Sequence, residues 1–156
     1  MILRRNLRLW LAVAVLVLAA CSGASSGEAD PLREVNDATA ARLCSSYFAS
    51  AGALRDARNN FSTDGIDAAA ESYDRLAADA RAAGAKPFAS ESSKAAEATR
   101  ALARYSRDAL AAGPPSTAAG QSPSSAPLLT MLMKLQLPET QLYLACYSHG
   151  YTPSGP

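Results

Sequence analysis

The spacing of apolar residues in the middle of the chain constrains its fold more than any other feature. Between Thr63 and Gly84 these residues recur in alternating steps of three and four, which places them on one face of an α-helix. A half-buried strand would need alternation every second residue, and no sustained run of that kind built from Val, Ile and Thr follows the N-terminal region. We therefore expect an all-α protein. The positions that define this helical face are Ile66, Ala69, Tyr73, Leu76, Ala80 and Ala83.

Similar patterns and the residues between them predict four helices. Segment 32–59 forms the first helix, 63–84 the second and 90–112 the third, with Lys86-Pro87 between the second and third. Ser62 or Thr63 can cap the start of the second helix, and Gly84 suits its end.

The last predicted helix starts near Pro127, and Pro138 should kink or divide it. Connections of a few residues favour antiparallel neighbours, so we expect an antiparallel four-helix bundle. Alanine dominates these helices, which favours helix formation and predicts a thin core between closely packed helices.

Two stretches have too few large apolar residues to fold by themselves. Residues 22–30 are rich in Gly, Ser and Ala and are expected to form a flexible spacer. Residues 113–127 combine four prolines with five Ser or Thr residues and have no charge, so we expect a disordered loop. This loop is either a simple exposed linker or an acceptor of O-linked sugars.

The N-terminal residues have the parts of a secretion signal. Arg4, Arg5 and Arg8 precede an apolar run of 12 residues over 9–20, which is shorter than the roughly 20 residues of a membrane-spanning helix. The run ends in Leu18-Ala19-Ala20-Cys21. This tetrapeptide, with the charge and apolar length before it, resembles the lipobox of bacterial lipoproteins.

The resemblance covers about the first 25 residues and implies a lipid anchor. Cys21 would be joined to diacylglycerol through its thiol, after which cleavage between Ala20 and Cys21 makes it the new N-terminus. The membrane is then a partner through this diacylglycerol, on the extracytoplasmic face of the cell membrane. Residues 4–8 also loosely resemble a twin-arginine export signal, so the export route stays open. The Ala- and Arg-rich remainder is similar in composition to small lipoproteins of high-GC Gram-positive bacteria.

The distribution of charge argues against a nucleic-acid partner. The whole chain has 15 basic and 14 acidic residues, and three of the basic ones lie in residues 1–20. The mature chain therefore has 12 basic and 14 acidic residues, a net charge of 12 − 14 = −2. Nucleic-acid affinity comes from basic groups that neutralise phosphates, and such a chain lacks the excess they require.

The remaining cysteines predict a disulfide. Cys44 and Cys146 each lie on the apolar face of a terminal helix. With Cys21 used for the lipid, they are left as a pair in an oxidising compartment. A bond between them would close a loop of 102 residues and contribute up to about 4.7 kcal/mol in the chain-entropy model.

The sequence offers no strong catalytic or metal-binding pattern. It lacks H-E-x-x-H, C-x-x-C and the phosphate-binding G-x-x-x-x-G-K-[ST] pattern, and its single histidine, His149, has no acidic neighbour in sequence. Cys146 and His149 could suggest a metal pair, but Cys146 is better explained by the disulfide. We expect no enzyme activity, no metal and no cofactor.

Tyrosines are the remaining candidates for a binding site. Tyr143, Tyr147 and Tyr151 recur every four residues and should form a ridge along the last helix. This ridge either completes the core or forms an exposed strip for a protein partner, with Tyr151 the most exposed and Tyr143 the most buried. In a third interpretation, an apolar ligand fills a gap lined by Tyr47, Tyr73 and Tyr105.

The sequence thus predicts a domain order and a class of function. The order is a signal peptide (1–20), a lipidated Cys and tether (21–30), a helical domain (31–150) and a tail (151–156). We expect a lipid-anchored envelope protein that acts as a non-catalytic binding or interaction module for an envelope protein partner. The alternative is a carrier of a small apolar ligand or lipid in the bundle interior.

Overall fold

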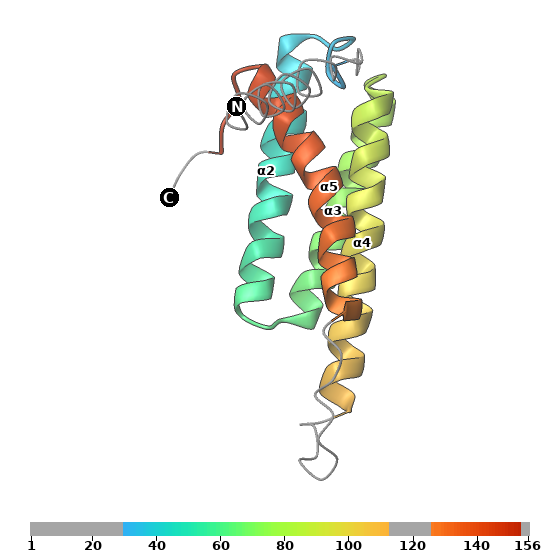
Figure 1. Cartoon of the computed structure of the whole chain (residues 1–156). Helices are drawn as coiled ribbons and strands as arrows, with labels where there is room; N and C mark the ends of the chain where they lie inside the picture. The colour runs from blue at the N-terminus through green and yellow to red at the C-terminus, as the bar shows by residue number, and fades with distance from the viewer. Residues whose placement is uncertain (1–29, 113–125, 154–156) are drawn as a thin grey trace, which may run out of the picture. The chain divides into compact units, whose positions relative to one another are not determined.

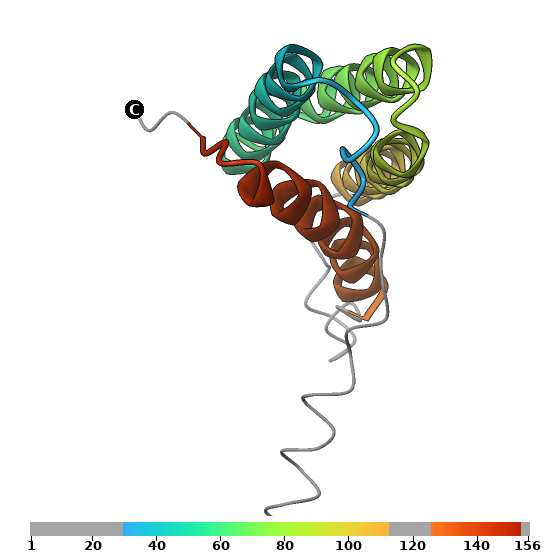
Figure 2. The same cartoon turned by 90° about the horizontal axis from the view of Figure 1, so that it is seen from above.

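The computed structural model describes residues 30–112 and 126–153. These residues contain four α-helices and no strand: α2 (Asp37–Asn59), α3 (Thr63–Ala82), α4 (Lys86–Ala111) and α5 (Ala126–Ser148). Consecutive helices run antiparallel and pack together, and α5 completes the bundle against α4 and α2 (Figures 1 and 2). The predicted all-α four-helix bundle is confirmed.

Several predictions concern residues outside this description. The signal peptide, the lipid site at Cys21, most of the tether, residues 113–125 of the predicted loop and the last three residues of the tail all lie outside it. The chain divides after Asp30 into two units, and all four helices belong to the second. The predicted loop is too long by two residues, because α5 already starts at Ala126.

Side-chain caps set the starts of α2 and α3. The Asn36 side chain accepts a hydrogen bond from the backbone N–H of Thr39 at 2.9 Å, and the Ser62 hydroxyl accepts one from Gly65 at 3.0 Å. An N-cap residue has extended backbone angles, and Asn36 has φ −74° and ψ 159°. The first helix therefore begins at Asp37, and the expected start at Leu32 is wrong.

Prolines explain the two other differences from the expected helices. The third helix begins at Lys86 and not at Ser90, because Pro87 fits the first turn, where a missing N–H costs nothing. Pro138 is buried inside α5, which continues as one helix through it. Of the two expected effects of Pro138, division of the helix therefore does not occur.

Three helices end in the same hydrogen-bonded turn, with one residue at positive φ. Backbone N–H groups just past each helix bond back to carbonyls of its last turn, a Schellman arrangement that favours glycine at the positive-φ position. Gly84 and Gly150 occupy that position after α3 and α5, at φ 82° and 81°. After α2 the position is held by Phe61 at φ 52°, and it is the one non-glycine residue with positive φ among those described.

The core is built mainly from small side chains. Alanines are almost fully buried at many positions where helices meet, and Ser92 and Thr99 are fully buried in α4. The hydroxyls of these two residues donate to carbonyls one turn earlier, Phe88 O at 2.9 Å and Ala95 O at 2.7 Å, so neither needs a partner in another helix. The larger buried side chains include Leu43, Leu54, Tyr73, Leu76, Phe88, Leu135 and Leu142.

A disulfide joins the first and last helices of the bundle. Cys44 in α2 and Cys146 in α5 are both fully buried and bonded, with their Cα atoms 5.5 Å apart. The predicted pairing is confirmed. Helix α5 packs against α4 over more of its length than against α2, so the bond lies in the smaller of the two contacts.

Candidate functional site

Helix α5 is apolar on two opposite sides. Its inward side buries Leu135, Leu142 and Cys146 in the core. Its outward side exposes six large apolar side chains along the whole helix, each between 39 and 66 % accessible. We call this set the α5 outer face; it comprises Leu129, Met133, Leu137, Tyr143, Leu144 and Tyr147.

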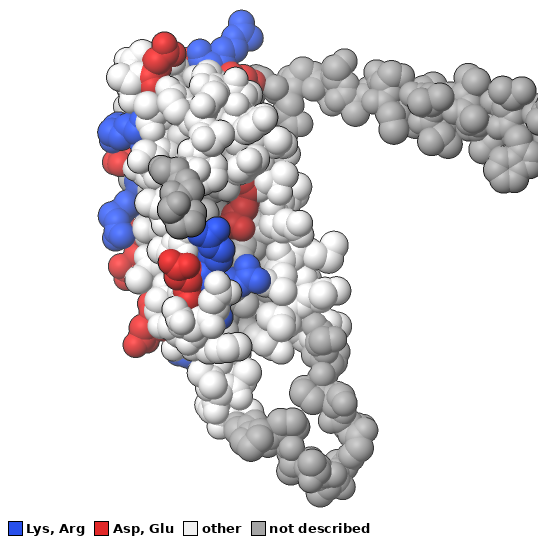
Figure 3. Space-filling model, turned by 90° about the vertical axis from the view of Figure 1, so that its left-hand side faces the viewer, with Lys and Arg blue, Asp and Glu red and all other residues white. Residues whose placement is uncertain are grey.

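Charge is scarce on α5 and frequent on the other helices. Among its 23 residues only Lys134 and Glu139 are charged. Ion pairs join α2 to α3 (Arg42 with Asp79, 3.5 Å) and α3 to α4 (Asp74 with Arg100 and Asp67 with Arg107). On the face that Figure 3 shows, the coloured charges gather toward the left and centre, and much of the right side is uncharged.

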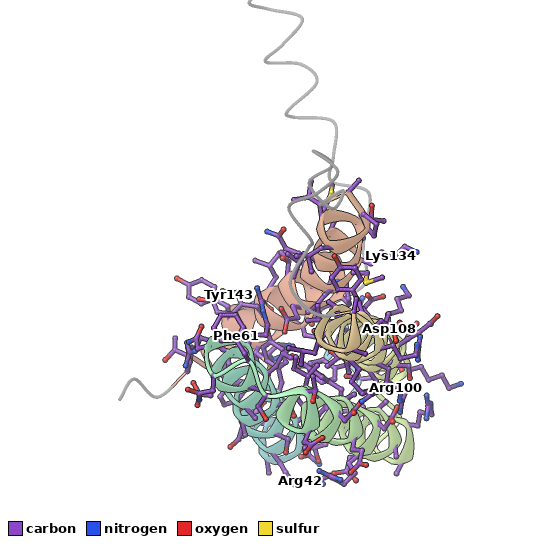
Figure 4. The ribbon with its side chains drawn as sticks, turned by 90° about the horizontal axis from the view of Figure 1, so that it is seen from below. Arg42, Phe61, Arg100, Asp108, Lys134 and Tyr143 are labelled. Carbon is purple, nitrogen blue, oxygen red and sulfur yellow. A yellow bond between two sulfur atoms is a disulfide. The ribbon has the colours of Figure 1, made fainter. Side chains whose placement is uncertain are left out.

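Two of the three ridge tyrosines form an exposed aromatic cluster with α2. The rings of Tyr143 and Tyr147 are stacked with centroids 5.9 Å apart, and Phe48 meets the edge of Tyr143 at 6.2 Å. Tyr143 points outward from α5 in Figure 4. Its accessible fraction is 39 %, and that of Tyr147 is 58 %. The stacked rings of Tyr143 and Tyr147 are thus partly covered and still present apolar surface to a partner.

The expected order of exposure along the ridge is wrong. Tyr151 was expected to be the most exposed, but it is partly buried and its hydroxyl donates to the Asp37 carbonyl oxygen at 2.9 Å. It follows the turn at Gly150, which leads the chain back across the start of α2. Tyr143 was expected to be the most buried of the three and is exposed instead.

Two buried tyrosines meet Glu139 in the core. The Tyr73 hydroxyl donates to the Glu139 carboxylate at 2.6 Å, and the Tyr47 hydroxyl donates to the Glu139 backbone carbonyl at 2.9 Å. Burial and the nearby Glu139 carboxylate raise the pKa of both tyrosines well above the ordinary value. Both phenols therefore stay protonated and act as hydrogen-bond donors that fix α5 to α2 and α3.

A hollow opens at the end of the bundle where α2 turns into α3. It has a volume of about 410 Å³ and is lined by parts of all four helices and by Phe61. We call it the loop-end groove; its lining includes Arg58, Phe61, Ile66, Leu102, Tyr105, Leu110, Leu128 and Leu132.

The expected gap lined by Tyr47, Tyr73 and Tyr105 does not exist as one space. Tyr73 is fully buried and Tyr47 is 4 % exposed, and both belong to the packed core. Tyr105 lines the loop-end groove, whereas Tyr47 borders a different hollow of about 350 Å³ between α2 and α5. Tyr47 and Tyr73 meet at Glu139, whereas Tyr105 lies at the loop-end groove, so the three side chains share neither of these hollows.

The described residues contain no group of three or more His, Cys, Asp and Glu side chains close enough to hold a metal ion. Cys146 is in the disulfide and has no thiolate to offer, and His149 lies half-buried just past α5. Within the same part of the chain, every helix is too short or too polar to span a membrane.

Sequence reasoning missed two of these features. The sequence does contain an indication of the α5 outer face, since residues 126–148 include only two charged residues. When both sides of a helix are apolar, however, the sequence does not show which side packs against the core. Nothing in the sequence indicates the role of Phe61, because its positive φ and its exposure depend on the turn between α2 and α3.

Comparison with known proteins gives no relative. No protein family, no curated protein and no solved structure matches the chain.

Proposed function

We propose that this protein is an exported, lipid-anchored envelope lipoprotein that acts as a non-catalytic interaction module. The α5 outer face is its contact surface. The observation that carries the proposal is that α5 keeps six large apolar side chains exposed on its outward side, spread from Leu129 to Tyr147. The open side of a surface helix normally has polar and charged residues, whereas α5 has large apolar residues at six of its exposed positions.

The energetics favour a partner on this surface. Fully burying one exposed large apolar side chain contributes about 1.5–3 kcal/mol, and each of the six side chains on the α5 outer face, 39 to 66 % exposed, would contribute roughly half of that on being covered. Isolated exposed leucines are common on proteins, but six large apolar side chains exposed on one side of one helix favour an interaction site. Tyr143 and Tyr147 add the residue type that is enriched among the energetically dominant contacts of interfaces.

The surroundings of the α5 outer face resemble the rim of a protein interface. Met133 and Leu137 border a groove of about 570 Å³, whose other wall on α4 includes Lys94, Glu97 and Arg104. An apolar centre with a polar, charged rim is the usual anatomy of a protein–protein contact. A protein partner therefore fits the surface well.

Two features support the proposed location, anchored to the membrane outside the cytoplasm. The sequence Leu18-Ala19-Ala20-Cys21 resembles a lipobox. The Cys44–Cys146 bond suits an oxidising compartment outside the cytoplasm. A diacylglycerol anchor contributes two acyl chains, which suffices for stable membrane attachment.

Site-specific photo-crosslinking in intact cells tests the contact surface. A photoreactive amino acid is placed at Leu137 or Tyr147 on the α5 outer face, and at Arg75 on α3 as the control. Arg75 is equally open, with 70 % of its side chain exposed. We expect the two α5 positions to crosslink one and the same protein and the control to give none. Equal products at all three positions, or none at any, would contradict the proposal.

A second candidate function is favoured by the loop-end groove. Its volume of about 410 Å³ lies within the range of ligand pockets, roughly 300–1,000 Å³, and its walls are mostly apolar. The protein would then carry a small apolar ligand or lipid, held at the end of the bundle.

A further inference from the structure

Two properties of Phe61 are unusual for a phenylalanine: its φ is positive, and its side chain is exposed. The other two Schellman turns use Gly84 and Gly150, because a side chain raises the energy of the left-handed conformation. A phenylalanine is also expected to be buried, yet Phe61 is 86 % exposed. Neither backbone geometry nor core packing explains the residue. Outliers of this kind in backbone geometry gather at ligand-binding positions.

The place of Phe61 gives its side chain a use. It lies at the rim of the loop-end groove, beside walls formed by Ile66, Leu102, Leu128 and Leu132. Figure 4 looks at the bundle from this end, with Phe61 labelled beside α2. A ligand in the groove would cover the ring and remove its apolar surface from water. A bound ligand would thus account for an aromatic residue that the free protein leaves exposed.

The charge at the groove indicates which end group a ligand has. Arg58 is the one charged residue in its lining, and its guanidinium makes no ion pair with any residue in the described part of the chain. Arg42, Arg100 and Arg107 each have an acidic partner, whereas the exposed Arg55 and Arg104 have no ion pair within the described residues either. A guanidinium binds carboxylates and phosphates with two parallel hydrogen bonds. An anionic group at the mouth of the groove complements it.

The volume limits the apolar part of such a ligand. A methylene group takes up about as much room as a water molecule in the liquid, roughly 30 Å³, so 410 Å³ accommodates about a dozen of them. That is room for most of one long acyl chain.

We propose that the loop-end groove binds one long-chain fatty acid, with its chain in the groove against Phe61 and its carboxylate at Arg58. The proposal rests on the second candidate function, that of a carrier, and names its ligand class and site. It is independent of the α5 outer face.

Binding of a fluorescent fatty acid tests this. The probe is cis-parinaric acid, and the protein is the full chain with Cys21→Ser, so that no acyl chain is attached covalently. We expect saturable binding of one probe per chain, displacement by palmitate, and at least about tenfold weaker displacement by methyl palmitate, which lacks the charge.

Variants in the groove separate binding from folding. Phe61→Asn should weaken probe binding and raise the melting temperature, because asparagine adopts positive φ more readily. Opposite changes of this kind cannot come from misfolding. Arg58→Gln should reduce the advantage of palmitate over its methyl ester, and Leu110→Glu, at a position 68 % exposed, should weaken binding of both. The controls, Arg75→Gln and Ala82→Glu on the exposed side of α3, should bind as the parent does.

Several results would overturn the proposal. One is the absence of saturable probe binding, and another is unchanged binding by all three groove variants. A concentration-dependent increase in mass that Phe61→Asn abolishes, without probe binding, would assign the groove to a second copy of the chain. Cosedimentation with anionic vesicles, again without probe binding, would assign it to a membrane surface.

Mass spectrometry of lipids that copurify from cells distinguishes failure of this proposal from failure of the carrier function. If lipid copurifies equally with the parent and with Phe61→Asn, the protein is a carrier but the groove is not the site. If no lipid copurifies and no probe binds, the carrier function fails as well.

Discussion

At the residue scale, Glu139 shows how a polar group is used inside an alanine-rich core. Its carboxylate accepts a hydrogen bond from the fully buried Tyr73, and its backbone carbonyl accepts one from Tyr47. One residue of α5 is thereby fixed to two other helices. Small alanine side chains offer little surface for packing, so directed hydrogen bonds of this kind help to set the position of α5.

The hydrogen bond from Tyr73 should be measurable in stability. A hydrogen bond to a charged group contributes about 1.5–3 kcal/mol, so Tyr73→Phe should lower the free energy of unfolding by about that amount at pH 8. Urea unfolding measures it. Tyr147→Phe, which removes a hydroxyl from an exposed ring, is the control and should cost less than about 0.5 kcal/mol.

The free energies of unfolding of the parent and of Tyr73→Phe should respond differently to alkaline pH. The folded state raises the pKa of Tyr73 above its ordinary value of 10.0, so the unfolded chain loses this proton first. Stability from Tyr73 is therefore complete below pH 10 and falls as the pH rises above it. The difference between the parent and Tyr73→Phe should narrow by about 1.4 kcal/mol between pH 8 and pH 11. An unchanged difference would mean that Tyr73 is not desolvated.

At the element scale, α5 is held in the bundle differently from the other helices. Ion pairs on the outer surface connect α2, α3 and α4. Helix α5 instead uses apolar packing, the hydrogen bonds to Glu139 and the disulfide at Cys146. Its open side keeps apolar residues where the other helices have charges, which is why we assign the contact surface to α5.

Loss of the disulfide should therefore act mainly on α5. Cys44→Ser and Cys146→Ser should each destabilise the domain by about 2–5 kcal/mol, the usual cost of removing a native disulfide. The double variant should cost no more than either single variant, because all three remove the same bond. Urea unfolding measures the loss, and hydrogen exchange should show the largest increase in α5. Free thiol in the denatured, unreduced parent protein would contradict the bond itself.

At the scale of the whole molecule, the chain combines a proposed anchor with one compact helical unit. The helices all lie in the unit that begins at Pro31. The proposed lipid at Cys21 precedes that unit by ten positions. Under this proposal, the helical unit would act as a binding module at the membrane surface.

Cys21→Ser should separate the helical unit from the membrane. Without the thiol no diacylglycerol is attached, so we expect uncleaved precursor or protein released in soluble form. Fractionation of cells and the intact mass of the protein measure this. The disulfide and the thermal stability of the domain should not change, which serves as the control. A variant that stays in the membrane fraction with the mass of the parent would show that the lipobox interpretation is wrong.

Much of the fold could be predicted because it depends on local rules. Apolar steps of three and four identified the helices, Ser62 and Gly84 marked two helix ends, and the two cysteines on terminal helices predicted their bond. Boundaries were less certain, as Lys86 and Asp37 show. They depend on whether a particular proline or asparagine lies inside or outside the first turn.

The candidate site depended on tertiary structure. The sequence determined that Tyr143, Tyr147 and Tyr151 share a ridge, since helical spacing is local. Which of them is covered was decided by the packing of α5 against α2 and by the turn at Gly150, which brings the Tyr151 hydroxyl to Asp37. The loop-end groove likewise forms only because the turn between α2 and α3 lies beside the C-terminal half of α4 and the N-terminal half of α5. Spacing along one chain fixes the faces of a helix, whereas exposure is a property of what the other helices leave uncovered.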